Sequence, residues 1–308
     1  MLNYFILSYF FEPNSADNFS KRSNQLVTEI TDTLKINKVD LLILPELCLS
    51  FDKLSKEPLK SIKVKSKIIY KLKQICIKYN TNICFPFLEN IEGKNYNTAI
   101  YINRNGEIAG KYHKVFLIKD EIDAGLTPGE INQKCIKIDN INIATSICFD
   151  ENFPELIENW RRQDINLIIF PAYTYSGELI RSWAIHLGSP LISCFPWLST
   201  SYDNDGHILS NIGTETALIK NGSHPKYSLV KINLNSKIYH IDYNHYNINN
   251  LLHKYSNDIT IKLMPHEARF KLTVNSNKLK IEELEQEHNL IPINNYLLES
   301  KHYTKLTQ

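Results

Sequence analysis

The stretch that decides the fold runs from Ile141 to Glu155 and reads INIATSICFDENFPE. Its first residues are apolar and mostly β-branched or small, which predicts a buried strand that ends near Cys148. The following Phe153-Pro154-Glu155 suits the start of a helix. A cysteine at such a corner is held up from the sheet edge, near outward-pointing backbone N–H groups that are able to stabilise a developing oxyanion. Taken alone, however, the residue type favours a buried core thiol.

Length and composition limit the possible functions. The 308 residues are enough to bury one large core or two smaller ones, and 35 basic against 33 acidic residues leave a net charge of only +2. This balance argues against nucleic acid and against an anionic membrane as partners. No segment has the ~18 consecutive apolar residues of a membrane span, and the apolar N-terminus lacks the features of a signal peptide. The six cysteines show no metal-ligand spacing, so we expect reduced thiols in a cytoplasmic protein without a metal or cofactor.

Strands and helices alternate through the first part of the chain. Residues 3–11 and 41–44 are predicted strands, and a helix between them has N-cap candidates at 15–17. A lysine-rich amphipathic helix is predicted over about 58–79 and a further strand over 81–88. Strand and helix units in this order favour a layered α/β architecture.

The pattern continues beyond this region. A hairpin is predicted around the turn dipeptide Asn105-Gly106 and a second one around Asn221-Gly222. The acidic stretch after Lys119 reads as a loop, and two helices and two extended segments follow the Cys148 corner. The predicted ranges are 96–102 with 107–112 and 215–219 with 227–232 for the hairpins, 154–163 and 176–187 for the helices, and 165–170 and 191–198 for the extended segments.

The composition changes after about Ser236, where the chain becomes rich in Asn, Lys, His and Tyr. We therefore predict one domain over residues 1–235 and an extension over 236–308 that packs on the body or on a neighbouring subunit. A strand over 269–274 and an acidic helix over 281–288 are the elements that the extension itself suggests. A flexible tail is the alternative.

Three residues of complementary chemistry stand beside predicted strand ends: Glu46, Lys114 and Cys148. A thiol becomes a good nucleophile when a base removes its proton or a cation lowers its pKa, and the other two residues supply one of each. Lys114 and the backbone N–H of Phe149 are candidates to hold the charge that attack on an amide or nitrile creates. Glu46 is alternatively a solvated loop charge, and an interior Lys114 needs a partner.

The segments around these residues resemble, in order, the three signature segments of the nitrilase superfamily of carbon–nitrogen hydrolases, and the resemblance covers about residues 1–235. It implies a four-layer α-β-β-α sandwich, with Glu46 as base, Lys114 as oxyanion support and Cys148 as nucleophile. It also implies association into homodimers or larger homo-oligomers. The segments are Leu44 to Leu47, Gly110 to Lys114 and Ile147 to Glu155, with Thr127-Pro128-Gly129 between the second and the third.

The resemblance implies further site residues. Members use a second glutamate between the lysine and the cysteine, for which Glu121 is the nearest match, although its spacing to Thr127-Pro128-Gly129 is unusual. Asp120 and Asp123 are the alternatives. Tyr173, together with Tyr175, follows the strand after the cysteine, in a loop that often contacts substrate.

These observations predict an amidase that cleaves a small linear amide through a thioester on Cys148. Within the family the alternatives are a nitrilase, an N-carbamoyl amidohydrolase and an acyl-transferring amidase. From another mechanistic class, a cysteine–histidine hydrolase would pair Cys148 with His186 or His113. A scaffold that kept the fold but lost the chemistry is the non-enzymatic alternative.

Overall fold

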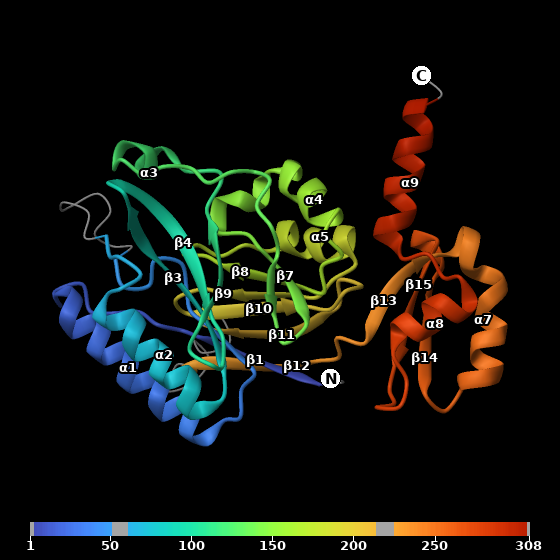
Figure 1. The fold of residues 1–308 in the computed structure, drawn as a ribbon, viewed down its shortest axis with the longest axis horizontal. Coiled ribbons are helices and arrows are strands. Elements are labelled where there is room, and N and C mark those ends of the chain that lie inside the picture. The colour runs from blue at the N-terminus through green and yellow to red at the C-terminus, as the bar shows by residue number, and fades with distance from the viewer. Residues whose placement is uncertain (1–2, 51–60, 214–224, 307–308) are drawn as a thin grey trace.

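Two six-stranded sheets form the centre of the molecule. The computed structural model describes residues 3–50, 61–213 and 225–306. The sheets pack face to face, and a pair of helices covers the outer face of each, which confirms the predicted α-β-β-α sandwich (Figure 1). The outer helices are α1 (Phe19–Ile36) and α2 (Lys67–Tyr79) on one side and α4 (Pro154–Arg161) and α5 (Glu178–Leu187) on the other.

The strand order of the first sheet is β12-β1-β2-β3-β4-β5, and that of the second is β11-β10-β9-β8-β7-β6. The first sheet consists of β1 (Tyr4–Tyr9), β2 (Leu41–Ile43), β3 (Asn82–Ile91), β4 (Lys94–Ile102), β5 (Ile108–His113) and β12 (Tyr227–Ile232). The second consists of β6 (Ile136–Ile138), β7 (Ile141–Thr145), β8 (Leu167–Pro171), β9 (Leu191–Cys194), β10 (Leu198–Tyr202) and β11 (Ile208–Gly213).

The central strands of both sheets are parallel and buried on both faces, which explains why they read as continuous apolar runs. Alternate residues of β1 illustrate the two layers. Tyr4 and Ile6 face the second sheet, whereas Leu7 and Tyr9 pack in the core beneath the outer helices. Parallel strands end at a common edge, so the residues that follow β2 and β7 meet at the same side of the sandwich.

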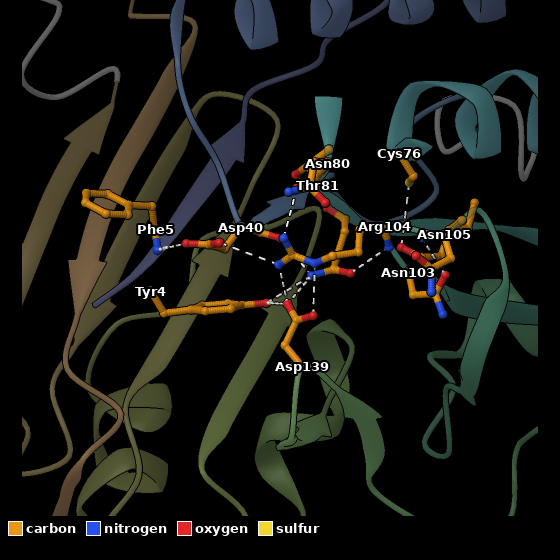
Figure 2. Close-up of polar contacts among 12 residues, drawn as sticks. Tyr4, Phe5, Asp40, Cys76, Asn80, Thr81, Asn103, Arg104, Asn105 and Asp139 are labelled. Carbon is orange, nitrogen blue, oxygen red and sulfur yellow. Dashed lines mark hydrogen bonds and ion pairs between the residues drawn. The ribbon is translucent and has the colours of Figure 1, made fainter. Parts of the chain in front are cut away.

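The opposite edge is closed by a polar network (Figure 2). Arg104 Nε donates to Asp139 Oδ1 at 3.0 Å, and its Nη2 lies 3.5 Å from Asp40 Oδ1. Tyr4 and Asn82 also donate to the Asp139 carboxylate. Asp139 lies in the turn between β6 and β7, whereas the other residues lie in strands of the first sheet or in the chain next to them. This network therefore joins the two sheets at the edge away from Cys148.

Several predicted boundaries are wrong. The lysine-rich helix begins at Lys67 rather than near residue 58, because Ile62 forms an isolated β-bridge with Glu89 and the N-cap Ser66 is extended; residues 51–60 lie outside the described part of the chain. The first helix is capped by Asn18, whose side chain accepts from the backbone N–H of Lys21, and not by 15–17.

The second sheet and the acidic stretch also differ from the prediction. The extended segment 191–198 is β9 and the start of β10, which pair antiparallel across a tight turn. The stretch after Lys119 contains a short helix, α3 (Lys119–Asp123). β12 pairs with β1, while 215–219 and Asn221-Gly222 of the predicted second hairpin lie outside the described residues. The hairpin around Asn105-Gly106 is confirmed by the pairing of β4 with β5.

The C-terminal segment forms a compact unit of its own with a separate apolar core (Figure 1). The predicted strand over 269–274 and helix over 281–288 are confirmed as β15 and α8. The elements are β13 (Ser236–His240), α7 (Ile241–Tyr255), β14 (Ile259–Met264), a 3-10 turn (Pro265–Glu267), β15 (Arg269–Val274), α8 (Ile281–His288) and α9 (Ile293–Leu306), with the strands in the order β13-β15-β14.

This unit contacts the body at the carboxyl end of α5. Arg269 Nη1 donates to the carbonyl of Ile185 at 2.9 Å, and Asn294 Nδ2 donates to that of Leu187 at 2.8 Å. The last carbonyls of a helix have no partners within the helix, so these donors satisfy groups that α5 leaves open. The domain boundary at residue 235 stays a prediction. None of the helices in the described ranges has the length and apolar character of a membrane span.

Candidate active site

Four of the predicted residues meet at the carboxyl edge of the two sheets. Glu46 follows β2, Lys114 follows β5, Glu121 lies in α3, and Cys148 begins a 3-10 helix (Cys148–Asn152) after β7. The first three side chains are at most 2% exposed. A lysine and two glutamates that are buried to this extent are costly unless they are paired.

Lys114 is paired with both carboxylates. Its Nζ lies 2.9 Å from Glu46 Oε1 and 2.8 Å from Glu121 Oε2. Burial by itself would lower the pKa of Lys114, but the two carboxylates outweigh it, so the pKa lies above its ordinary value. The lysine therefore stays charged in the interior and is a fixed positive group beside Cys148.

Cys148 stands at a strained corner. Its φ of 46° lies in the left-handed region, which is unfavourable for a residue with a side chain. Its Sγ lies 3.5 Å from Thr174 Oγ1. Burial, and then the charge of Glu46, raise the pKa of the thiol to about 12, while Lys114 acts in the opposite direction. The thiol is consequently neutral at ordinary pH and needs a base to become a nucleophile.

Glu46 is the carboxylate whose charge acts on that thiol. The backbone N–H of Tyr173 donates to its Oε2 at 3.0 Å, and Lys114 donates to Oε1. The main chain at Tyr173 also lowers the pKa of Cys148. The loop after β8 thus lies against both the predicted base and the predicted nucleophile.

Two buried residues that the sequence patterns did not reveal complete the arrangement. Asn97 in β4 donates to Glu46 and to Glu121. Asp150 accepts from the backbone N–H groups of Phe116 and Ile147 at 2.8 and 2.9 Å and so joins the chain near Lys114 to the chain that enters Cys148. Asn97 lies in a predicted strand and Asp150 in a predicted turn. The sequence signal that could have identified them is a polar side chain at a position that should face the core.

The alternative acids and histidines are engaged elsewhere. Asp120 and Asp123 are exposed, and Asp123 pairs with Lys119. His113 lies 3.5 Å from Glu89 and stacks on Tyr96. His186 is at the end of α5, where burial and then Arg161 lower its pKa. Within the described chain, the charges that act on Cys148 come from Glu46 and Lys114, not from a histidine.

A cavity of about 200 Å³ lies beside Glu46 and Tyr173. The Tyr173 ring packs edge-on against Trp197, and Tyr175 is half exposed beside Phe195. Phe149 is also partly exposed, and its ring packs edge-on against that of Phe153. The residues that line the cavity are Phe11, Glu12, Pro13, Ser15, Glu46, Cys48, Tyr173 and Pro196.

The match to known proteins covers most of this architecture. Residues 13–220, well over half of the chain, match the family described as Carbon-nitrogen hydrolase. The chain belongs to this family. Deaminated glutathione amidase of Synechocystis sp. is 37% identical over 106 residues, which are 30% of this chain and 39% of that protein. Omega-amidase NIT3 of Saccharomyces cerevisiae is 31% identical over 171 residues, which are 49% of this chain and 56% of that protein.

The chain thus spans between two fifths and just over half of the length of these two hydrolases. Solved structures match over a greater length. Saccharomyces cerevisiae Nit3, a member of the nitrilase superfamily, has a TM-score of 0.62 at 22% identity, over 75% of this chain and 90% of its own. A carbon-nitrogen hydrolase from Helicobacter pylori G27 has a TM-score of 0.63 at 16% identity, over 76% of this chain and 89% of its own. The predicted membership in the nitrilase superfamily of carbon–nitrogen hydrolases is confirmed.

Proposed function

We propose that this carbon–nitrogen hydrolase is an amidase that cleaves a small linear amide through a thioester on Cys148. The observation that carries the proposal is the position of Lys114, held between Glu46 and Glu121 next to a thiol that is neutral at ordinary pH. A neutral thiol needs a general base, and the adjacent carboxylate supplies one.

In the first half of the reaction, Glu46 takes the proton from the Cys148 thiol as sulfur attacks the carbonyl carbon. The carbon–oxygen π electrons move to oxygen, and Lys114 with the backbone N–H of Phe149 hold the resulting oxyanion. As the carbonyl re-forms, the carbon–nitrogen bond breaks and Glu46 returns the proton to the leaving nitrogen. Ammonia or an amine departs, and the acyl group remains on sulfur.

In the second half, water replaces the amine. Glu46 takes a proton from water as its oxygen attacks the thioester carbon, and the same oxyanion contacts hold the charge. The carbon–sulfur bond then breaks, and the thiolate recovers the proton. Glu121 keeps Lys114 in place, and the Ile118 N–H together with Lys114 holds the Glu121 carboxylate itself.

The cavity beside Glu46 supports a small acyl group. Its volume of about 200 Å³ suits a short chain, and its lining combines aromatic and proline side chains with the carboxylates of Glu12 and Glu46, which suits a substrate that carries a polar group. Tyr173 and Phe149, near the thiol, are the residues that we propose contact the substrate. A nitrilase, an N-carbamoyl amidohydrolase or an acyl-transferring amidase would use the same residues, so the substrate decides among them.

A panel of short amides, nitriles and N-carbamoyl amino acids, assayed for ammonia release with and without hydroxylamine as acyl acceptor, tests this proposal. We expect the amides to give the highest kcat/KM and Cys148→Ala to abolish turnover. Cys135→Ala, a change at a partly buried cysteine elsewhere, is the matched control and should stay active. Hydrolysis that Cys148→Ala leaves undiminished would contradict the proposed function. A Cys148 that is inert toward thiol-directed electrophiles would point to the inactive scaffold.

We also infer that the chain works in the cytoplasm as a homodimer or larger homo-oligomer. All six cysteines are free thiols, as expected where disulfides are reduced. The association is what the family resemblance implies. Light scattering of the full chain measures the mass, and a monomer at micromolar concentration would contradict the inference.

A further inference from the structure

Asn97 bridges the two carboxylates of the site. Its side-chain Nδ2 donates to Glu46 Oε1 at 2.8 Å and to Glu121 Oε1 at 2.9 Å, and the residue is 1% exposed. Its backbone carbonyl accepts from the N–H of Lys114 at 2.9 Å. One residue of β4 therefore holds both glutamates through its side chain and the lysine through its main chain.

The orientation of the Asn97 amide is fixed by its neighbours. The reverse orientation would place Oδ1 against two carboxylate oxygens, where no donor is available. In the observed orientation both Nδ2 hydrogens are used, and Oδ1 is buried without a hydrogen-bond partner among the residues that the structure describes. An unpaired buried oxygen costs on the order of 1–3 kcal/mol of folding free energy. This orientation is therefore unfavourable at Oδ1, but it directs two donors at the carboxylates.

The charges explain why two donors are needed there. Glu46 and Glu121 are two buried negative groups that share a single buried cation, Lys114. The second hydrogen-bond donor that they have in common is the neutral amide of Asn97. Without it, the groups in the described part of the chain that balance the repulsion between the carboxylates would be Lys114 and one backbone N–H on each side chain, those of Tyr173 and Ile118.

We propose that Asn97 is a positioning residue for the acid–base steps at Cys148. It donates to both carboxylates, holds them side by side and directs Glu46 at the thiol without adding a charge of its own. This role rests on the proposed function, because it acts through Glu46 as the base. It does not require Asn97 to touch the substrate.

The test compares Asn97→Ala with Asn82→Ala. Asn82 is a matched control because it is also a buried asparagine in the first sheet, and it donates to Asp139 at the opposite edge. We expect Asn97→Ala to lower kcat on the order of 100-fold, as small displacements of catalytic groups do. We expect KM to stay similar and the acidic limb of the kcat profile to move to higher pH. Asn82→Ala should lose stability but keep both kcat and the profile.

Asn97→Asp keeps the shape of the side chain but replaces the two donors with a third carboxyl group. We expect its kcat to be at least as low as that of Asn97→Ala. If the alanine variant does not fold, Asn97→Asp alone tests the positioning role of Asn97. An Asn97→Asp enzyme with wild-type kcat and an unshifted profile would overturn the proposal. So would a loss confined to KM, which would mean that Asn97 binds substrate.

A measurement without substrate separates this proposal from the proposed function. Alkylation of Cys148 by iodoacetamide, followed across alkaline pH, reports the ionisation of the thiol directly. Loss of the Asn97 donor leaves more negative potential beside the thiol, so the midpoint should move to higher pH in Asn97→Ala and stay unchanged in Asn82→Ala. If the wild type hydrolyses no amide but this shift occurs, the proposed function fails, whereas the effect of the Asn97 donor on the ionisation of Cys148 stands. Identical midpoints in all three proteins would overturn the role of Asn97.

Discussion

Lys114 Nζ donates to Glu121 Oε2 at 2.8 Å, although only seven positions separate the two residues. The short helix α3 makes this contact possible, because it turns the chain back so that the carboxylate points inward. The backbone N–H of Ile118 donates to the same Oε2 at 3.0 Å and fixes the turn. Asp120 and Asp123, the neighbours of Glu121 in α3, face solvent. The helix therefore directs one of its three acidic side chains toward Lys114.

We expect Glu121→Gln to reduce kcat on the order of 100-fold, since Lys114 loses one of its two charged partners and shifts from the position in which we propose that it supports the oxyanion. Asp120→Asn is the matched control and should leave kcat unchanged, because its side chain is exposed on the same helix. Steady-state ammonia release from a short amide measures both. Equal losses in the two variants would show that the helix, not the carboxylate, matters.

Glu46→Gln and Lys114→Met should move the pKa of Cys148 in opposite directions while both abolish turnover. The charge of Glu46 raises the thiol pKa and the charge of Lys114 lowers it, so the first variant lowers the pKa and the second raises it. The ultraviolet absorbance of the thiolate, titrated in each variant, checks the signs. A thiolate–imidazolium mechanism predicts no such pair of shifts, and His186→Ala would then be the damaging change.

Asp150 should make the stability depend on pH in a recognisable way. Burial raises the pKa of its carboxyl from 3.8 to about 6, against the opposing backbone N–H donors of Phe116 and Ile147. Between about pH 4 and pH 6 the folded state therefore binds more proton than the unfolded state, and stability falls as pH rises. The shift corresponds to about 3 kcal/mol.

The test for Asp150 is the difference in unfolding free energy between the wild type and Asp150→Asn, measured by urea denaturation. We expect the advantage of the wild type over the variant to shrink by about 3 kcal/mol between pH 3 and pH 7. A difference that is constant with pH would contradict the assignment of the titration to Asp150.

The contact between Arg269 and the end of α5 should hold the C-terminal unit in place. Removing the guanidinium leaves the Ile185 carbonyl without its donor, so Arg269→Ala should cost about 2 kcal/mol and make residues 236–308 easier to cleave in limited proteolysis. Ammonia release should not change, because the site lies at the carboxyl edge of the sheets. Lys301→Ala, which removes the exposed ion pair with Glu158, is the control and should have little effect on either. Loss of activity in Arg269→Ala without increased cleavage would contradict a purely structural contact.

How far the sequence predicted the site depends on the kind of signal each residue carries. Cys148 and Glu46 each follow a strand that is largely buried on both faces, and such strands are visible as apolar runs. Lys114 follows β5, a half-buried edge strand that was predicted from its hairpin turn. The meeting of Cys148 and Glu46 at one edge follows from the parallel order of the strands. The roles assigned to these residues, and that of Glu121, stay predictions.

Other features had a weak local signal or none. Asn97 lies in the polar first half of β4, on the same face as the buried Ala99 and Tyr101, and only the fold shows that two carboxylates lie opposite it. The acidic composition after Lys119 favoured a hydrated loop, yet a single buried ion pair was enough to stabilise a turn of helix. The late start of α2 depends on the bridge between Ile62 and Glu89, which is a tertiary contact.

The central claim is that Cys148 carries the acyl group during turnover. The most direct test is to mix the enzyme with a short amide, quench the reaction in acid and measure the masses of the intact protein and its peptides by mass spectrometry. We expect a mass increase equal to the acyl group on the peptide that contains Cys148, with a larger fraction modified in Glu121→Gln if deacylation is slowed. Steady ammonia release without any adduct, or an adduct on another residue, would contradict the account.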